Sequence, residues 1–258
     1  MVSDSILQRL SDEIGIDKYS VLREVIQIQF LEELYKTDES RDIFFKGGTA
    51  LKILFGSNRY SEDLDFTANL SEKKIRKVVN FSVDNLKKEY PLVQVKDAKT
   101  LSGVSQKIIL PVDFSLQPLT IKLDFSLREK VLTPKSGTIF TNLPITTTSI
   151  IRHISEEEIM AEKYRAIINR NKGRDLYDFL FLLKRGVKFN VKIVKEKLKY
   201  YNEEYNPDEF IKKVRNWKEK EIDEDLRRFL PLRDRKIIPE IKDLVIKRFE
   251  EIVDTSKS

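Results

Sequence analysis

Apolar residues recur at intervals of three and four along the first half of the chain, which is the period of a helix with one buried face. This spacing predicts helices over residues 5–15, 19–36, 49–56 and 71–91. Gly56 ends the third helix, and Pro91 ends the fourth. The fourth helix starts with a capping-box pattern at Ser71, in which Lys74 stands where Glu is preferred.

The segments between these helices are short, and their apolar residues either alternate with polar ones or run together, as in strands. They predict strands over residues 42–46, 62–68, 92–99, 105–114 and 119–129. Pro111 marks an edge or a bulge in the fourth strand, because proline donates no ladder hydrogen bond.

From about Ser155 the alternation disappears, and the remaining chain has helical spacing with polar interruptions and a frayed end at 254–258. The sequence therefore predicts an α/β (α+β) fold in two domains. Residues 1–154 would form an α/β domain with the N-terminal helices, and residues 155–258 a helical domain.

The stretch "YSEDLDFT", residues 60–67, places two carboxylates on one side of a predicted strand. Alternation sends Leu64 and Phe66 to one face and Asp63 and Asp65 to the other. Strand residues two apart are separated by roughly 6–7 Å, so these acids repel each other unless a positive charge lies near both.

A third acid, Asp124, has the same pattern in "TIKLDFS", residues 120–126. It shares the polar face of its strand with Lys122 and Ser126, so the three acids converge if the two strands are close. Three carboxylates without histidine or cysteine make an oxygen site that suits Mg²⁺ or Mn²⁺. The alternative is that each Asp lies exposed on the wet face of a sheet.

Composition excludes several other chemistries. The 258 residues include no cysteine and one histidine, His153, which excludes disulfides, thiolate nucleophiles, cysteine-ligated zinc and a multi-histidine metal site. The formal net charge of +6 favours a polyanionic partner. No apolar run approaches the roughly 20 residues of a membrane span, and no signal-peptide layout is present, so we expect a cytoplasmic protein without membrane contact.

A phosphate-binding turn is expected just before the acids. Gly47 and Gly48 let a ligand approach the backbone, and the following helix points its free N–H groups at the same place. Thr49 and Ser61 could add hydroxyls. A tight turn without a ligand is the alternative for a diglycine alone.

Together, the Gly-Gly turn, the D-x-D strand and the distant strand Asp resemble the nucleotidyltransferase fold of the DNA polymerase β superfamily, with a mixed sheet flanked by helices. The segment "FKGGTALKILFGSNRYSEDLDFT" resembles more closely the AbiEii/AbiGii (MenT-like) toxin branch, associated with abortive infection. The matching residues are Lys46, Gly47, Gly48, Thr49, Leu51, Arg59, Ser61, Asp63, Asp65 and Phe66.

A second signature of that branch lies in the helical half, in "AEKYRAIINRNKGRDLYDFLFLL". It is carried by Lys163, Arg174, Asp175 and Asp178, with Phe179 where Leu is usual. The two signatures span about residues 42 to 183, and the last 75 residues contribute nothing to the resemblance.

The resemblance implies a role for each matched group. Asp63 and Asp65, with Asp124, would hold the divalent cations, and Asp124 would help to activate the attacking hydroxyl. The nucleotide-binding residues would be Lys46, Gly47, Gly48, Thr49, Arg59, Ser61 and Lys163. Lys163 and Asp175 would complete the catalytic set from the helical domain.

Several of these residues have a structural alternative. Lys163 could be a solvated helix lysine, and Asp175 a helix cap. Asp178 could pair with Arg174, and Arg59 could pair with Glu62 or Asp63 instead of phosphate. The aromatic residues Tyr200, Tyr201, Tyr205 and Trp217 could stack on RNA bases or pack between helices.

The resemblance implies a metal-dependent enzyme that moves a nucleoside monophosphate from a nucleoside triphosphate to an acceptor. The acceptor would be RNA, in particular tRNA, and the enzyme would be the toxin of a type IV-like AbiE pair with a cognate antitoxin protein. Transfer to a protein or small-molecule hydroxyl, and nucleotide binding without turnover, are the alternatives.

Overall fold

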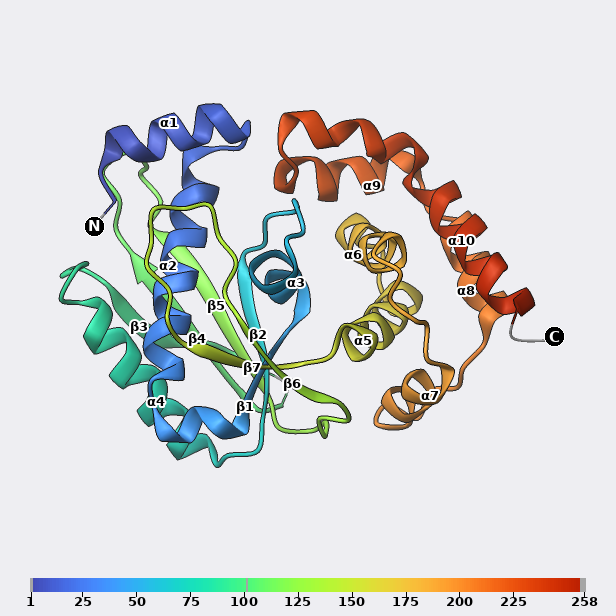
Figure 1. The fold of residues 1–258 in the computed structure, drawn as a ribbon, viewed down its shortest axis with the longest axis horizontal. Helices are drawn as coiled ribbons and strands as arrows, with labels where there is room; N and C mark the ends of the chain where they lie inside the picture. The colour runs from blue at the N-terminus through green and yellow to red at the C-terminus, as the bar shows by residue number, and fades with distance from the viewer. Residues whose placement is uncertain (1, 101, 256–258) are drawn as a thin grey trace. The chain divides into compact units, whose positions relative to one another are not determined.

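The computed structural model of the protein describes residues 2–100 and 102–255 and divides the chain into two units (Figure 1). The first unit holds the chain up to Gly56 and Tyr60–Ile154, and the second holds Ser57–Arg59 and the chain from Ser155 onward. Three residues between α3 (Gly47–Phe55) and β2 (Asp63–Ala68) thus belong with the helical unit. Of the terminus expected to be frayed, residues 256–258 lie outside the described residues.

Among the described residues, seven strands form one sheet in the order β3-β4-β5-β2-β1-β7-β6. Besides β2 they are β1 (Ile43–Lys46), β3 (Gln94–Asp97), β4 (Val104–Leu110), β5 (Leu119–Ser126), β6 (Pro134–Thr138) and β7 (Ile150–Ile154). β2 runs parallel to β5 and β1 parallel to β7, while the other neighbours are antiparallel. The predicted fold class, a mixed sheet with flanking helices, is confirmed.

The strands β6 and β7 are absent from the sequence-based prediction. β6 reads "PKSGT", whose proline, glycine and polar residues give no alternation, and it is mostly exposed. β7 reads "IIRHI" and is only five residues long. β4 ends at Leu110, directly before the proline expected to interrupt that strand.

Aromatic side chains fill the apolar face of the central strands. The rings of Phe45, Phe66 and Phe125, from β1, β2 and β5, lie 5.4 and 4.7 Å from centroid to centroid. α2 (Lys18–Tyr35) contacts β5 and β7, α4 (Glu72–Leu86) contacts β3 and β4, and α1 (Asp4–Ile14) packs on α2. On the opposite, polar face, the start of α3 lies against β2 at Asp65.

The second unit contains helices that share an aromatic core. They are α5 (Glu156–Asn169), α6 (Gly173–Lys184), α7 (Val191–Lys199), α8 (Pro207–Arg215), α9 (Glu219–Leu226) and α10 (Ile241–Thr255), with short 3₁₀ helices η2 (Arg227–Phe229) and η3 (Leu232–Glu240). In the first unit, a further 3₁₀ helix, η1 (Asp38–Asp42), precedes β1.

The core of the second unit is built around Tyr164, whose ring stacks on Phe210 at 4.9 Å and lies 5.5 Å from Tyr205. Trp217 is 3% exposed. Helix packing therefore accounts for Tyr205 and Trp217, two of the aromatic residues considered for RNA stacking. None of the helices in the described part of the chain has a stretch long and apolar enough to cross a membrane.

Candidate active site

The polar face of β2 and β5 carries the three strand carboxylates. These neighbouring parallel strands are in a register that pairs Asp65 with Asp124 and Asp63 with Lys122. Adjacent strands lie about 4.8 Å apart, so Asp65 and Asp124 are direct neighbours. The prediction that the three acids converge required these two strands to be neighbours, and they are. All three acids are partly exposed.

Lys122 supplies the positive charge that the close acids require. Its Nζ lies 2.5 Å from Oδ2 of Asp124, and the two side chains are 37% and 32% exposed. Burial lowers the pKa of Lys122, but the hydrogen bond with Asp124 and the charges of Asp124, Asp63 and Asp65 together raise it above its ordinary value. The ammonium group is therefore a counter-ion for the whole carboxylate cluster.

The glycine turn at the start of α3 lies directly against Asp65. Gly47 has a φ of +79°, and a Cβ placed there would lie 2.4 Å from Oδ2 of Asp65. Only glycine fits both the backbone conformation and this close approach. The first turn of α3, with its free backbone N–H groups, thus starts beside a carboxylate of the cluster.

Hydroxyl and amide groups fix the start of β2. Thr49 is 1% exposed, and its hydroxyl donates a hydrogen bond to the backbone oxygen of Asp63. Nε2 of Gln27 donates to the backbone oxygen of Ser61 at 3.1 Å. The Thr49 hydroxyl thereby ties α3 to the strand that carries Asp63 and Asp65.

A second lysine flanks the acids on the other side. Lys46 is paired in register with Asp65 across the antiparallel strands β1 and β2. Its Nζ lies 3.7 Å from Oε2 of Glu129, whose side chain is 6% exposed. Lys46 is thus held in place by a buried carboxylate that the sequence patterns did not single out.

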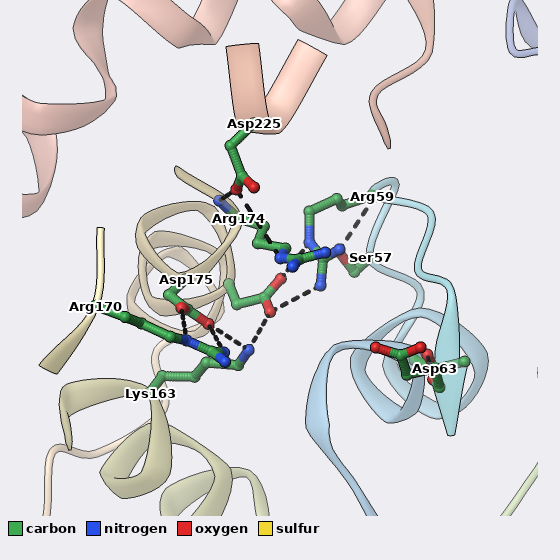
Figure 2. Close-up of polar contacts among 10 residues, drawn as sticks. Ser57, Arg59, Asp63, Lys163, Arg170, Arg174, Asp175 and Asp225 are labelled. Carbon is green, nitrogen blue, oxygen red and sulfur yellow. Dashed lines mark hydrogen bonds and ion pairs between the residues drawn. The ribbon is translucent and has the colours of Figure 1, made fainter. Parts of the chain in front are cut away.

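In the second unit, buried acids and bases form a cluster, which Figure 2 shows with its polar contacts as dashed lines. Arg59 is 2% exposed and donates two hydrogen bonds to Asp178, from Nε at 2.7 Å and from Nη2 at 2.9 Å. Lys163 lies 2.9 Å from Asp175 and 2.7 Å from Asp178. Arg170 completes the cluster with two hydrogen bonds to Asp175 at 2.8 and 3.1 Å.

The two acids of this cluster are held as carboxylates. Their side chains are 0% exposed, and burial raises the pKa of each. The cations outweigh burial, so that Lys163 and Arg170 lower the pKa of Asp175 well below its usual range, and Arg59 and Lys163 lower that of Asp178. Lys163 is 10% exposed and is therefore not an ordinary solvated lysine.

The second signature thus has different partners from those considered from the sequence. Asp178 pairs with Arg59 and Lys163. The backbone N–H of Arg174 donates a hydrogen bond to the carboxylate of Asp225 at 3.2 Å. The pairing of Arg59 with Asp178 joins residues 119 positions apart, and no local pattern indicates it.

The strand carboxylates fit a divalent cation by their chemistry. They are oxygen donors on adjacent strands in register, and Gly47 lets the backbone at the start of α3 come close to Asp65. Within residues 2–100 and 102–255, however, no three His, Asp or Glu side chains are gathered as a ready metal site. In this structure Lys122 occupies the position of the counter-charge to Asp124.

A profile described as nucleotidyl transferase AbiEii toxin of a type IV toxin–antitoxin system matches residues 29–255. The chain belongs to the AbiEii family. Membership makes the protein a nucleotidyltransferase of a toxin family of toxin–antitoxin systems.

Solved structures share the fold of this chain at low sequence identity. MenT4, a nucleotidyltransferase toxin of Mycobacterium tuberculosis, superposes with a TM-score of 0.71 at 19% identity, over 98% of this chain and 90% of that one. JHP933 of Helicobacter pylori gives a TM-score of 0.58 at 21% identity, over 94% of this chain and 97% of its own. A search of the curated proteins found no significant match.

Sequence reasoning missed Lys122 and Glu129 as parts of the site. The signal for Lys122 was present, because it lies two residues before Asp124 on the same face of its strand. Glu129 follows the end of β5, outside any alternating pattern, and only the structure brings it to Lys46.

Proposed function

We propose that this AbiEii-family protein transfers a nucleoside monophosphate from a nucleoside triphosphate to a hydroxyl of tRNA, in a reaction that depends on Mg²⁺ or Mn²⁺. The observation that carries the proposal is the in-register pair of Asp65 and Asp124, with Asp63 on the same face and the Gly47 turn against Asp65. The net charge of +6 supports an RNA acceptor.

In the proposed reaction, the acceptor oxygen forms a bond to the α-phosphorus while the bond to the leaving pyrophosphate breaks. Asp124 orients the acceptor hydroxyl and takes its proton. A divalent cation held by Asp63, Asp65 and Asp124 would neutralise charge on the phosphate oxygens.

The remaining residues of the first signature would bind the triphosphate. Backbone N–H groups of Gly47 and Gly48 point toward it from the first turn of α3. Lys46 supplies positive charge, and Ser61 and Thr49 are the hydroxyl-bearing residues of the set. Because the Thr49 hydroxyl is bonded to Asp63, we assign it the positioning of that acid as well.

From the second unit, the family resemblance assigns Lys163 to the triphosphate and Asp175 to catalysis. Asp175 holds the Lys163 ammonium at 2.9 Å, so it would keep that charge in place. Arg59, assigned to nucleotide binding by the same resemblance, is bound bidentately by Asp178 and would act by ordering this cluster.

We further propose that the protein is the toxin of a type IV-like pair, in which abortive infection is the outcome and a cognate antitoxin restrains it. Membership of the AbiEii family, the toxins of a type IV toxin–antitoxin system, supports this proposal. With tRNA as acceptor, the place of action would be the cytoplasm.

The test is incubation of the purified protein with Mg²⁺, total tRNA and each α-labelled nucleoside triphosphate. Asp65→Asn should abolish labelling, whereas Asp84→Asn, an exposed helix carboxylate that pairs with Lys87, is the matched control and should not. Label in RNA supports the proposal and names the nucleotide. Label on protein or on a small molecule would show that tRNA is not the acceptor. Nucleotide binding without transfer to any acceptor would refute the proposed reaction.

A further inference from the structure

A cation of the chain itself, Lys122, lies beside the proposed metal ligands. Lys122 precedes Asp124 by two residues on β5 and is in register with Asp63 on β2. Its Nζ lies 2.5 Å from Oδ2 of Asp124, an oxygen that the proposed function gives to a divalent cation.

A neighbouring lysine directs Lys122 toward the acids. Lys107 on the antiparallel strand β4 is in register with Lys122, on the side away from Asp63. Like charges directly opposite each other on a sheet repel. Lys122 therefore has a like charge on its β4 side and Asp63 on its β2 side, and its ion pair with Asp124, on its own strand, offsets the repulsion from Lys107.

The ion pair between Lys122 and Asp124 can also dissociate readily. Lys122 and Asp124 are 37% and 32% exposed, so the ammonium can return to water at little cost in solvation. This contrasts with Lys163, which is 10% exposed and held between two carboxylates that are 0% exposed. An exposed single pair is suited to exchange, and a buried network is not.

We propose that Lys122 is a positioning residue that offsets part of the negative charge of the carboxylate cluster in the metal-free protein and releases Asp124 to the divalent cation when that cation binds. This inference rests on the proposed function, because it takes Asp63, Asp65 and Asp124 as the metal ligands. A tethered ammonium group and a divalent cation compete for the same oxygen, so Lys122 sets the concentration at which metal binds.

The proposal predicts a change in metal affinity opposite to the one that structural damage would cause. Removal of the ammonium should tighten metal binding, because the competitor is lost and the acids repel one another until metal arrives. For one partly exposed unit charge beside a ligand, we expect a decrease of the Kd for Mn²⁺ of about five- to tenfold.

The experiment measures binding of Mn²⁺ alone, by isothermal titration calorimetry and by the loss of the free-ion signal in electron paramagnetic resonance. Lys122→Met keeps the apolar stem, Lys122→Gln is a second uncharged variant, and Lys122→Arg keeps the charge. Lys96→Met is the matched control, since it removes a lysine of the same sheet on β3, in register with Lys107 and not with Lys122, and it should leave the Kd for Mn²⁺ near that of the wild type.

The expected result is tighter Mn²⁺ binding in both uncharged variants, a lower melting temperature without metal, and a larger rise in melting temperature when metal is added. Lys122→Arg should bind Mn²⁺ as the wild type does. Unchanged or weaker binding in Lys122→Met, with wild-type binding intact and abolished by Asp65→Asn, overturns this inference alone. Wild-type protein that binds no Mn²⁺ overturns both it and the metal dependence of the proposed function.

Discussion

Replacement of Arg59 by methionine separates a structural from a phosphate-binding role for this residue. The guanidinium is 2% exposed and makes two hydrogen bonds to Asp178, whose side chain is 0% exposed. Removing one partner of a buried ion pair costs about 3–5 kcal/mol, because the other charge stays buried without compensation. Lys163 remains 2.7 Å from Asp178, which moves the expected cost of Arg59→Met to the lower end, about 3 kcal/mol.

That cost is measurable as a fall of roughly 6–12 °C in the melting temperature, at about 2–4 °C per kcal/mol for a chain of this size. Arg170→Met is the matched control, because Arg170 also binds a buried acid through two hydrogen bonds but is itself 54% exposed. Its loss should cost about 1 kcal/mol or less, since solvent screens the charge that is removed.

The reasoning fails if Arg59→Met melts within 1–2 °C of the wild type and instead weakens nucleoside triphosphate binding. That result would place the guanidinium on phosphate, as the family resemblance suggests. Arg59→Lys sharpens the distinction, because lysine keeps the charge but loses the bidentate geometry. It should recover only part of the stability and leave nucleotide affinity near that of Arg59→Met.

Two further predictions concern the glycine turn and the buried cluster. Gly47→Ala should abolish transfer, whereas Gly56→Ala should keep it. Both glycines have a positive φ, +79° and +76°, but only Gly47 lies against Asp65. Equal activity of the two variants in the labelling assay would contradict the argument that Gly47 is needed for the close approach to Asp65. The pKa of Asp175 is lowered in the folded state, so its contribution to stability is present above the unfolded-state value of about 4 and is lost as pH falls further. Lys163→Met should therefore move acid unfolding, followed by circular dichroism, to a higher pH, and an unchanged midpoint would show that the pair does not stabilise the carboxylate.

The part of the site that could be predicted from the sequence is the part encoded locally. Alternation in "EDLDFT" and "IKLDFS" puts Asp63, Asp65 and Asp124 on polar faces, and a diglycine before a helix indicates a close backbone approach. Periodicity does not reveal which strands are neighbours. The parallel pairing of β2 with β5, across α4 and the two strands β3 and β4, comes from the tertiary fold.

Long-range pairings account for most of what the sequence left open. Ser57–Arg59 reads as a loop between a helix and a strand, yet these residues group with the helical unit because Arg59 binds Asp178. Glu129 and β6 likewise have no local pattern, since one follows a strand end and the other is polar with proline and glycine. In each case the deciding partner is distant in the chain.

The two charged clusters differ in net charge and in exposure, and these differences suit them to different ligands. On the strands, Lys122 and Lys46 flank three aspartates and Glu129, so the cluster has more negative than positive charge, and the partly exposed Lys122 is a counter-ion that can leave. In the helical unit, Arg59, Lys163 and Arg170 face two fully buried carboxylates, so positive charge is in excess and the acids are already paired. A cation can enter the first cluster by exchange, whereas entry into the second would bring one more positive charge to an already cationic group. The charge balance therefore favours the strand acids over the helical cluster as the ligands of the cation in the proposed function, and the helical cluster is suited to hold a fixed positive charge for an anionic ligand.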